Sequence, residues 1–169
     1  GPIATSDAAM LALNAAATDL ARELGVERIE YRLRQPRMSD WHCDHETYVT
    51  FRKPLVSDPE EQMLQIPRKQ RAMIRKGMKE HLKGAIDGDA QRFYALYAES
   101  VRNLGTPVLA RRYFDCLKSV FAKDAEIVTI LSNGQAVASV LSFFFRDEVL
   151  PYYGGGGNAA RACSANDFM

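Results

Sequence analysis

A basic run between residues 68 and 83 is the densest chemical feature of this sequence. One set of cations recurs at steps of three, four and four and consists of Arg68, Arg71, Arg75 and Lys79. A second set recurs every seven residues and consists of Lys69, Lys76 and Lys83. On a helix each set forms one stripe, and the only acidic residue in the run is Glu80. Guanidinium and ammonium groups bind phosphates, so the run predicts a phosphate-binding face. The alternative is a solvated helix whose charges only keep it soluble.

A run of four glycines precedes a predicted helix start near Asn158 or Ala159. Glycines let the backbone approach an anion, and the first N–H groups of a helix point toward it. Arg161, one turn into that helix, would add a positive charge. The segment therefore predicts a pyrophosphate-binding loop, and the alternative is a flexible connection. The predicted cofactor-binding residues are Gly154, Gly155, Gly156, Gly157, Asn158 and Arg161.

Tyr152 and Tyr153 end a predicted strand directly before the glycines. Alternation along a strand sends one phenol to each face, so at least one could reach a cleft as an orienting or proton-donating group. The alternative is that both pack in the core or at its edge. These two tyrosines are the candidate catalytic residues.

Residues 41–46 bring His, Cys, Asp and Glu together in one predicted loop. Adjacent side chains seldom close a tetrahedron around zinc, so no metal site is predicted there. No GxSxG motif or catalytic-triad order occurs either. The predictions therefore include neither a metal nor a nucleophilic residue.

Composition limits the classes of partner and the compartment. A net charge of +1 provides no global field that would attract nucleic acid or a membrane. Three widely spaced cysteines fit a reducing compartment better than a disulfide scaffold. No apolar stretch approaches the ~20 residues that cross a bilayer, and no signal peptide is visible. We therefore expect a cytoplasmic protein, although the chain begins without Met and ends within a predicted helix.

The elements that must position these residues follow from periodicity and turn signals. Helices are predicted over residues 6–24, from Asp58, from Pro67, over 89–104 and over 110–121. Strands are predicted over 28–34, 48–52, 126–131, 136–145 and 148–153, with a short one near 83. The Asn133-Gly134 pair is typical of a hairpin turn. Hairpins instead of helical crossovers exclude a doubly wound parallel sheet and indicate an α+β fold.

Several segments carry a family resemblance, strongest over residues 66–169. They span 66–77, 104–108, 141–147, 150–155 and 165–169. In these segments the sequence resembles FemAB-like proteins of the GNAT acyltransferase superfamily, in particular the group associated with exosortase (PEP-CTERM) systems and exopolysaccharide loci. The resemblance implies a GNAT-like mixed sheet flanked by helices, within a tandem two-repeat architecture. Residues 1–57 would end the first repeat, 58–82 would connect the repeats, and 83–169 would begin the second.

The same resemblance implies an activity, namely acyl or aminoacyl transfer to an amine of a cell-envelope or exopolysaccharide precursor. The implied co-substrate is acyl-CoA or aminoacyl-tRNA, with no permanently bound cofactor. The acceptor would be phosphorylated, or linked to a lipid or a nucleotide. Its predicted contacts are Arg68, Lys69, Arg71, Arg75, Lys76 and Thr106, although Thr106 could simply cap a turn. The alternatives are an inactive GNAT-like module that binds a phosphorylated glycan or lipid carrier or scaffolds a secretion system, and an RNA-binding face.

Overall fold

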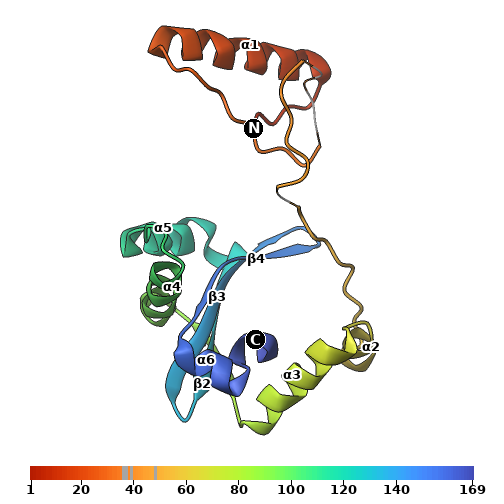
Figure 1. The fold of residues 1–169 in the computed structure, drawn as a ribbon, viewed down its shortest axis with the longest axis vertical. Coiled ribbons are helices and arrows are strands. Elements are labelled where there is room, and N and C mark those ends of the chain that lie inside the picture. The colour runs from red at the N-terminus through yellow and green to blue at the C-terminus, as the bar shows by residue number, and fades with distance from the viewer. Residues whose placement is uncertain (36–37, 39, 48) are drawn as a thin grey trace. The chain divides into compact units, whose positions relative to one another are not determined.

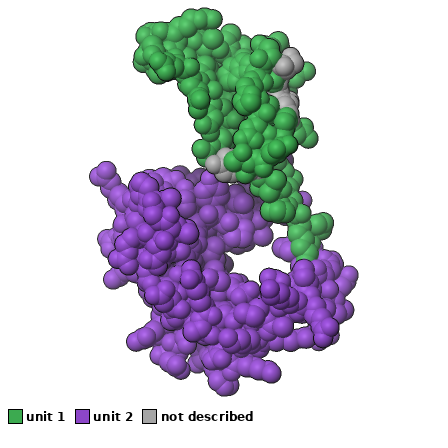
Figure 2. Space-filling model, in the orientation of Figure 1, with its two compact units in different colours: residues 1–54 green, residues 55–169 purple. Residues whose placement is uncertain are grey.

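Two units make up the part of the chain that the computed structural model describes, which is residues 1–35, 38, 40–47 and 49–169. Unit 1 comprises residues 1–54 and unit 2 comprises residues 55–169 (Figure 2). The predicted division into residues 1–57, 58–82 and 83–169 stays a prediction.

Unit 1 contains one long helix, α1 (Asp7–Leu24), where the sequence predicts it. The Ser6 hydroxyl accepts a hydrogen bond from the Ala9 amide and caps the first turn. Gly25 ends the helix in the left-handed conformation, with φ at 64°, which glycine adopts without steric cost. No residue of α1 is buried, so local capping and an alanine-rich sequence define this helix more than packing does.

The two strands predicted in unit 1 are wrong where the structure describes them. Residues 28–34 and 49–52 are not strands, and Tyr48 lies outside the described residues. A strand needs a neighbour to satisfy its backbone hydrogen bonds, and no described residue of unit 1 is in a strand. Tyr31 instead stacks on Trp41, with ring centroids 4.9 Å apart.

Unit 2 follows the predicted α+β order (Figure 1). It opens with α2 (Pro59–Leu64), α3 (Arg68–Lys79), β1 (Lys83–Asp87), α4 (Gln91–Asn103), α5 (Arg111–Phe121) and the 3-10 helix η1 (Ala122–Asp124). It closes with β2 (Ala125–Ser132), β3 (Gln135–Phe145), β4 (Glu148–Gly156), α6 (Asn158–Cys163) and α7 (Ala165–Phe168). The four strands pair in chain order and are antiparallel throughout. The parallel pair that a mixed sheet requires is not among the described strands.

The hairpin turn between β2 and β3 is the one that the sequence predicts. Asn133 and Gly134 both have positive φ, 50° and 80°, as a type I′ hairpin between β2 and β3 requires. Arg146 has a φ of 55° in the turn between β3 and β4. Asp58 caps α2 through its side chain, and Pro59 occupies the first turn.

Helices cover both faces of the sheet (Figure 1). On one face α4 and α5 enclose a core that consists of Ala90, Phe93, Tyr97, Phe114, Ala125, Ile127 and Leu141. On the other face α6 and α7 help enclose a second core, made of Leu82, Ile130, Val137, Ala138, Ala160 and Ala165. Helix α3 packs on α7, where a Cβ on Gly77 would lie 2.7 Å from the Phe168 Cβ. The edge of the sheet formed by β4 therefore runs between two helical layers.

Candidate functional site

The predicted glycine loop is largely a strand, because β4 continues through Gly156. Gly154, Gly155 and Gly156 pair with Val140, Ser139 and Ala138 of β3. The loop prediction is therefore wrong for these three glycines. Only Gly157 connects the strand to the helix, where its extended backbone (φ −71°) caps α6.

Close packing on both sides explains why glycines occupy this strand. A Cβ on Gly155 would lie 2.7 Å from the Leu96 carbonyl oxygen and 2.7 Å from the Tyr97 Cα, both in α4. On the opposite side, a Cβ on Gly156 would lie 2.6 Å from the Asn166 Oδ1. Side chains alternate between the faces of a strand, so the glycines let α4 approach one face and α6 and α7 the other.

Glu99 reaches the same end of β4 from α4 and was not among the sequence predictions. Both of its carboxylate oxygens lie 3.3 Å from the Cβ position of Gly157, which is itself buried. The side chain is half-buried and forms no hydrogen bond or ion pair with any other described residue. Its position three residues after buried Leu96, at the border of the apolar helix face, is the sequence signal that could have indicated it.

The tyrosines beside the glycines separate into a packed one and an exposed one. Tyr153 packs against the core of the α4–α5 face, and its hydroxyl lies 3.0 Å from that of Tyr113 in α5. Tyr152 is 60% exposed, and the register of β3 and β4 shifts at this point, which indicates a bulge. Burial, followed by the Tyr113 hydrogen bond, raises the pKa of Tyr153 above its ordinary value of 10.0. Tyr153 therefore stays protonated at neutral pH and can act as a donor, but not as a base.

The basic run forms α3 only as far as Lys79. Lys83 begins β1, so the predicted stripe of Lys69, Lys76 and Lys83 does not continue along one helix. Of the predicted acceptor contacts, Arg71 is half-buried and donates to the Leu64 carbonyl at 3.4 Å. Lys76 donates to the Ala162 carbonyl of α6 at 3.0 Å. The remaining cations of the predicted set, Arg68, Lys69 and Arg75, are exposed.

Thr106 follows the C-terminus of α4 and is exposed. Its hydroxyl donates to the Val101 carbonyl at 3.3 Å, and its amide donates to the same oxygen at 3.2 Å. The residue thus caps the end of α4, which is the plainer of its two predicted roles. A contact with the acceptor stays a prediction.

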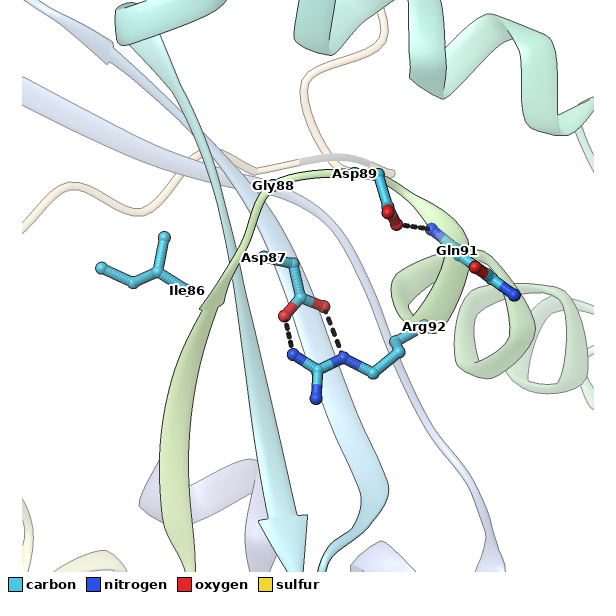
Figure 3. A pocket seen from close by; sticks show the side chains of 6 residues that line it. All are labelled: Ile86, Asp87, Gly88, Asp89, Gln91 and Arg92. Carbon is cyan, nitrogen blue, oxygen red and sulfur yellow. Dashed lines mark hydrogen bonds and ion pairs between the residues drawn. The ribbon is translucent and has the colours of Figure 1, made fainter.

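A buried polar network joins β1, β2 and β3 on the α4 face and was not predicted. Thr129 donates to the Asp87 carboxylate at 2.8 Å, and its oxygen lies 2.8 Å from the Ser139 hydroxyl. Arg92 of α4 pairs with Asp87, which is only 6% exposed. Figure 3 shows this carboxylate and guanidinium facing each other beside a pocket of about 270 Å³. Both oxygens of the Asp87 carboxylate already have hydrogen-bond partners. We therefore interpret the network as one that holds α4 against the sheet.

Unit 1 holds a larger cavity of about 770 Å³. Three arginines contribute to its lining, namely Arg32, Arg34 and Arg52. None of the predicted site residues lines either this cavity or the Asp87 pocket.

The predicted loop at residues 41–46 is held by Asp44. Its carboxylate accepts hydrogen bonds from Thr47 and from the Glu46 amide. Those bonds, chiefly from the Thr47 hydroxyl, lower the pKa of Asp44. Across the described residues, no three His, Cys, Asp or Glu side chains gather in a way that could hold a metal ion. No described helix combines the length and apolarity needed to cross a membrane.

Comparison with known proteins places the second unit in a family. The family model described as an acetyltransferase (GNAT) domain matches residues 68–169, from the first residue of α3 to one residue past the end of α7. No curated protein matches the chain. The match includes β4, both neighbouring helical layers and Glu99.

Proposed function

The chain belongs to the acetyltransferase (GNAT) domain family, and from that membership we propose that it forms part of a FemAB-type N-acyltransferase. Such a domain requires an acyl donor and an acceptor. The proposed reaction transfers an acyl or aminoacyl group to an amine of a cell-envelope or exopolysaccharide precursor. The sequence motifs favour the FemAB group associated with exosortase systems.

The cations of α3 are the observation that supports a phosphorylated acceptor. Residues 68–79 contain six lysines and arginines and no acidic residue. Arg68, Lys69 and Arg75 project from an exposed face, whereas the packing of Gly77 on α7 anchors the helix. A cationic face on an anchored helix suits a phosphate, or the diphosphate of a nucleotide-linked or lipid-linked sugar.

We propose that the acyl donor binds at the C-terminal, glycine-containing end of β4 and the start of α6. Acyl-CoA is the favoured donor, since GNAT domains generally use it, and aminoacyl-tRNA is the second candidate. Asn158 and Arg161 are exposed on α6 and could contact a pyrophosphate. The packing of α4 on Gly155 offers a second reason for the glycines, so the glycines alone do not carry this assignment.

We also propose that the protein has the tandem architecture of FemAB proteins. Residues 1–57 would then close a first GNAT-like repeat, and residues 83–169 would open a second one. The alternating residues 28–34 would become a strand only when a neighbouring strand is present, which accounts for their irregular conformation here.

Calorimetric titration of the full-length protein tests donor and acceptor separately. Acetyl-CoA should bind and release heat. Uridine diphosphate N-acetylglucosamine, as a nucleotide-linked probe, should bind wild type and lose roughly tenfold in affinity with Arg75→Glu, because a charge-assisted contact becomes a repulsion. Lys123→Glu, an exposed charge reversal on η1, is the matched control and should bind as wild type does.

The outcomes separate the candidates. No heat with acetyl-CoA would contradict an acyl-CoA donor, and equal affinities in the two variants would remove α3 from the acceptor site. Binding of tRNA with a steep salt dependence, abolished by Arg75→Glu, would favour aminoacyl-tRNA over acyl-CoA.

A further inference from the structure

We propose that unit 1 binds the diphosphate group of a small molecule in its cavity of about 770 Å³. Three arginines line this cavity, namely Arg32, Arg34 and Arg52. Every lining residue lies within residues 1–52, outside the segment that the family model matches. The site is therefore separate from the contacts proposed on α3 and α6, and it does not rest on the proposed acyl transfer.

The charge of the lining is the first argument. Besides the three arginines it contains only uncharged side chains, so no carboxylate belongs to the lining that the structure describes. A cleft lined by one sign of charge concentrates ions of the opposite sign. Arg34 makes no hydrogen bond or ion pair with any other described residue, so its donors are available to a ligand. An anion would satisfy those donors.

The second argument is that polar side chains from two segments meet at this cavity. Arg32 and Arg34 are two residues apart, as are Thr50 and Arg52, and both pairs contribute to the lining. Residues two apart share one side of an extended chain, so each segment turns a polar pair toward the same space. Pairing of residues 28–34 with a neighbouring strand would keep this arrangement, because a strand has the same alternation.

Contacts within unit 1 hold the segment that carries two of the arginines. Tyr31, directly before Arg32, stacks on Trp41 with ring centroids 4.9 Å apart. The Nε of Arg32 donates a hydrogen bond to the Glu30 carboxylate at 2.8 Å. Both contacts restrict the segment before a ligand arrives, so binding has fewer side chains to order.

The number and shape of the donors select the ligand. Guanidinium groups pair bidentately with carboxylates and phosphates, but a single carboxylate offers only two oxygens to three arginines. A diphosphate has oxygens on two phosphorus atoms and carries more negative charge, so it can contact guanidinium groups from both segments. Gln35 and Thr50 add uncharged donors to the lining.

An apolar wall indicates that the ligand is larger than its diphosphate. Ile3, Met10 and Leu33 also line the cavity, and Met10 is half-buried in the first turn of α1. The volume of about 770 Å³ lies within the range of small-molecule sites, roughly 300 to 1,000 Å³. The wall suits either the nucleoside of a nucleotide or the isoprenoid chain of a lipid carrier. The diphosphate is the chemistry that both share.

Calorimetric titration of the full-length protein with sodium pyrophosphate tests the diphosphate site. Wild type should bind with a saturable heat. Arg34→Gln should weaken binding roughly tenfold, and Arg34→Gln combined with Arg52→Gln roughly 100-fold, because each change removes a charge-assisted contact. Arg28→Gln is the matched control, since Arg28 is an exposed arginine of the same segment that does not line the cavity. This control should bind as wild type does.

A conservative variant distinguishes a shaped site from a general positive charge. Arg34→Lys keeps the charge but loses the planar fork, so its affinity for pyrophosphate should fall between those of wild type and Arg34→Gln. Absence of a saturable heat in wild type would overturn the proposal. So would equal affinity in wild type and the folded double variant, or a loss in Arg28→Gln as large as that in Arg34→Gln.

Two larger probes identify the rest of the ligand. Uridine diphosphate should bind more tightly than pyrophosphate if the apolar wall receives a nucleoside, and farnesyl diphosphate should do so if it receives an isoprenoid chain. Equal affinity for all three probes would overturn the role of the apolar wall.

Arg75→Glu separates this site from the acceptor contact proposed on α3. It should leave the Arg34-dependent binding of pyrophosphate unchanged, because Arg75 lies outside the lining of the cavity. If Arg75→Glu abolishes pyrophosphate binding and Arg34→Gln does not, the diphosphate binds on α3. The proposal for unit 1 then fails, whereas the phosphorylated acceptor of the proposed function stands.

Discussion

The two units use helices in opposite ways. In unit 2, α4 contributes three buried side chains, Phe93, Leu96 and Tyr97, to a core under the sheet. In unit 1, α1 is longer than α4 but contributes no buried side chain. None of the described residues between 1 and 54 is buried. Phe51 of unit 1 is 91% exposed, whereas Phe114 of unit 2 is fully enclosed. An amphipathic pattern therefore becomes a core only where a second layer faces it.

The largest expected contrast between the units comes from one phenylalanine in each. Phe114→Ala should lower the free energy of unfolding of unit 2 by about 4 kcal/mol, because it empties the centre of an aromatic cluster. Phe51→Ala should change stability by less than about 0.5 kcal/mol, since the ring has little burial to lose. Guanidinium unfolding followed by far-UV circular dichroism measures both changes.

Trp41 provides a separate signal for unit 1, as the only tryptophan of the chain. Its fluorescence should report the same transition in wild type and in Phe114→Ala if unit 1 is independent of the unit 2 core. A large effect of Phe51→Ala on either signal would remove the contrast drawn between the units.

A smaller effect should follow from a single methyl group on the glycine strand. Gly155→Ala places a Cβ against the α4 backbone, which cannot move as a side-chain end could, so we expect a loss of about 2 kcal/mol. The control is Gly84→Ala in β1, where a Cβ meets nothing within 4 Å. That change should be neutral or stabilising by about 0.5 kcal/mol, because alanine has less backbone entropy to lose. Equal losses in thermal unfolding would show that close packing does not explain these glycines.

The smallest expected effect is a loss of folding stability at alkaline pH. Burial raises the pKa of Tyr97 and Tyr153 in the folded state above the ordinary value of 10.0. Their contribution to stability is therefore complete below about pH 10 and falls as the pH rises further, because the unfolded chain releases these protons first. Unfolding free energies of wild type should decline from pH 9 to pH 11, and Tyr153→Phe should show a shallower decline. An identical slope in both proteins would argue against a buried, protonated Tyr153.

Sequence patterns identify most of unit 2 because its signals are local. Alternating residues and the Asn133-Gly134 turn predict the β2–β3 hairpin, and Pro67 marks the start of α3. Similar alternation fails at residues 28–34, where no neighbouring strand is available among the described residues of unit 1. The difference is that a turn is made by its own residues, whereas a strand depends on another segment for its hydrogen bonds.

The residues of the candidate site also differ in whether local sequence patterns or tertiary contacts reveal them. Tyr152, Tyr153 and the glycines could be located from the sequence, because they are consecutive and precede a helix. The residues that surround them could not be located in this way. Tyr113 comes from α5, 40 residues before Tyr153, and Glu99 comes from α4. The conformation of Gly154 to Gly156 also escaped prediction, because glycine permits both loop and strand.

By itself, then, the sequence determined which segments are helical, where the hairpins turn and which family unit 2 belongs to. Capping by Ser6, the left-handed Gly25 and the charge of α3 are properties of neighbouring residues, and they need no tertiary contact. Only the tertiary structure decided that the glycines form a strand between two helical layers. It also decided that an unpaired carboxylate lies beside Gly157. Both depend on how closely α4 approaches β4, a distance set by packing between segments more than 40 residues apart.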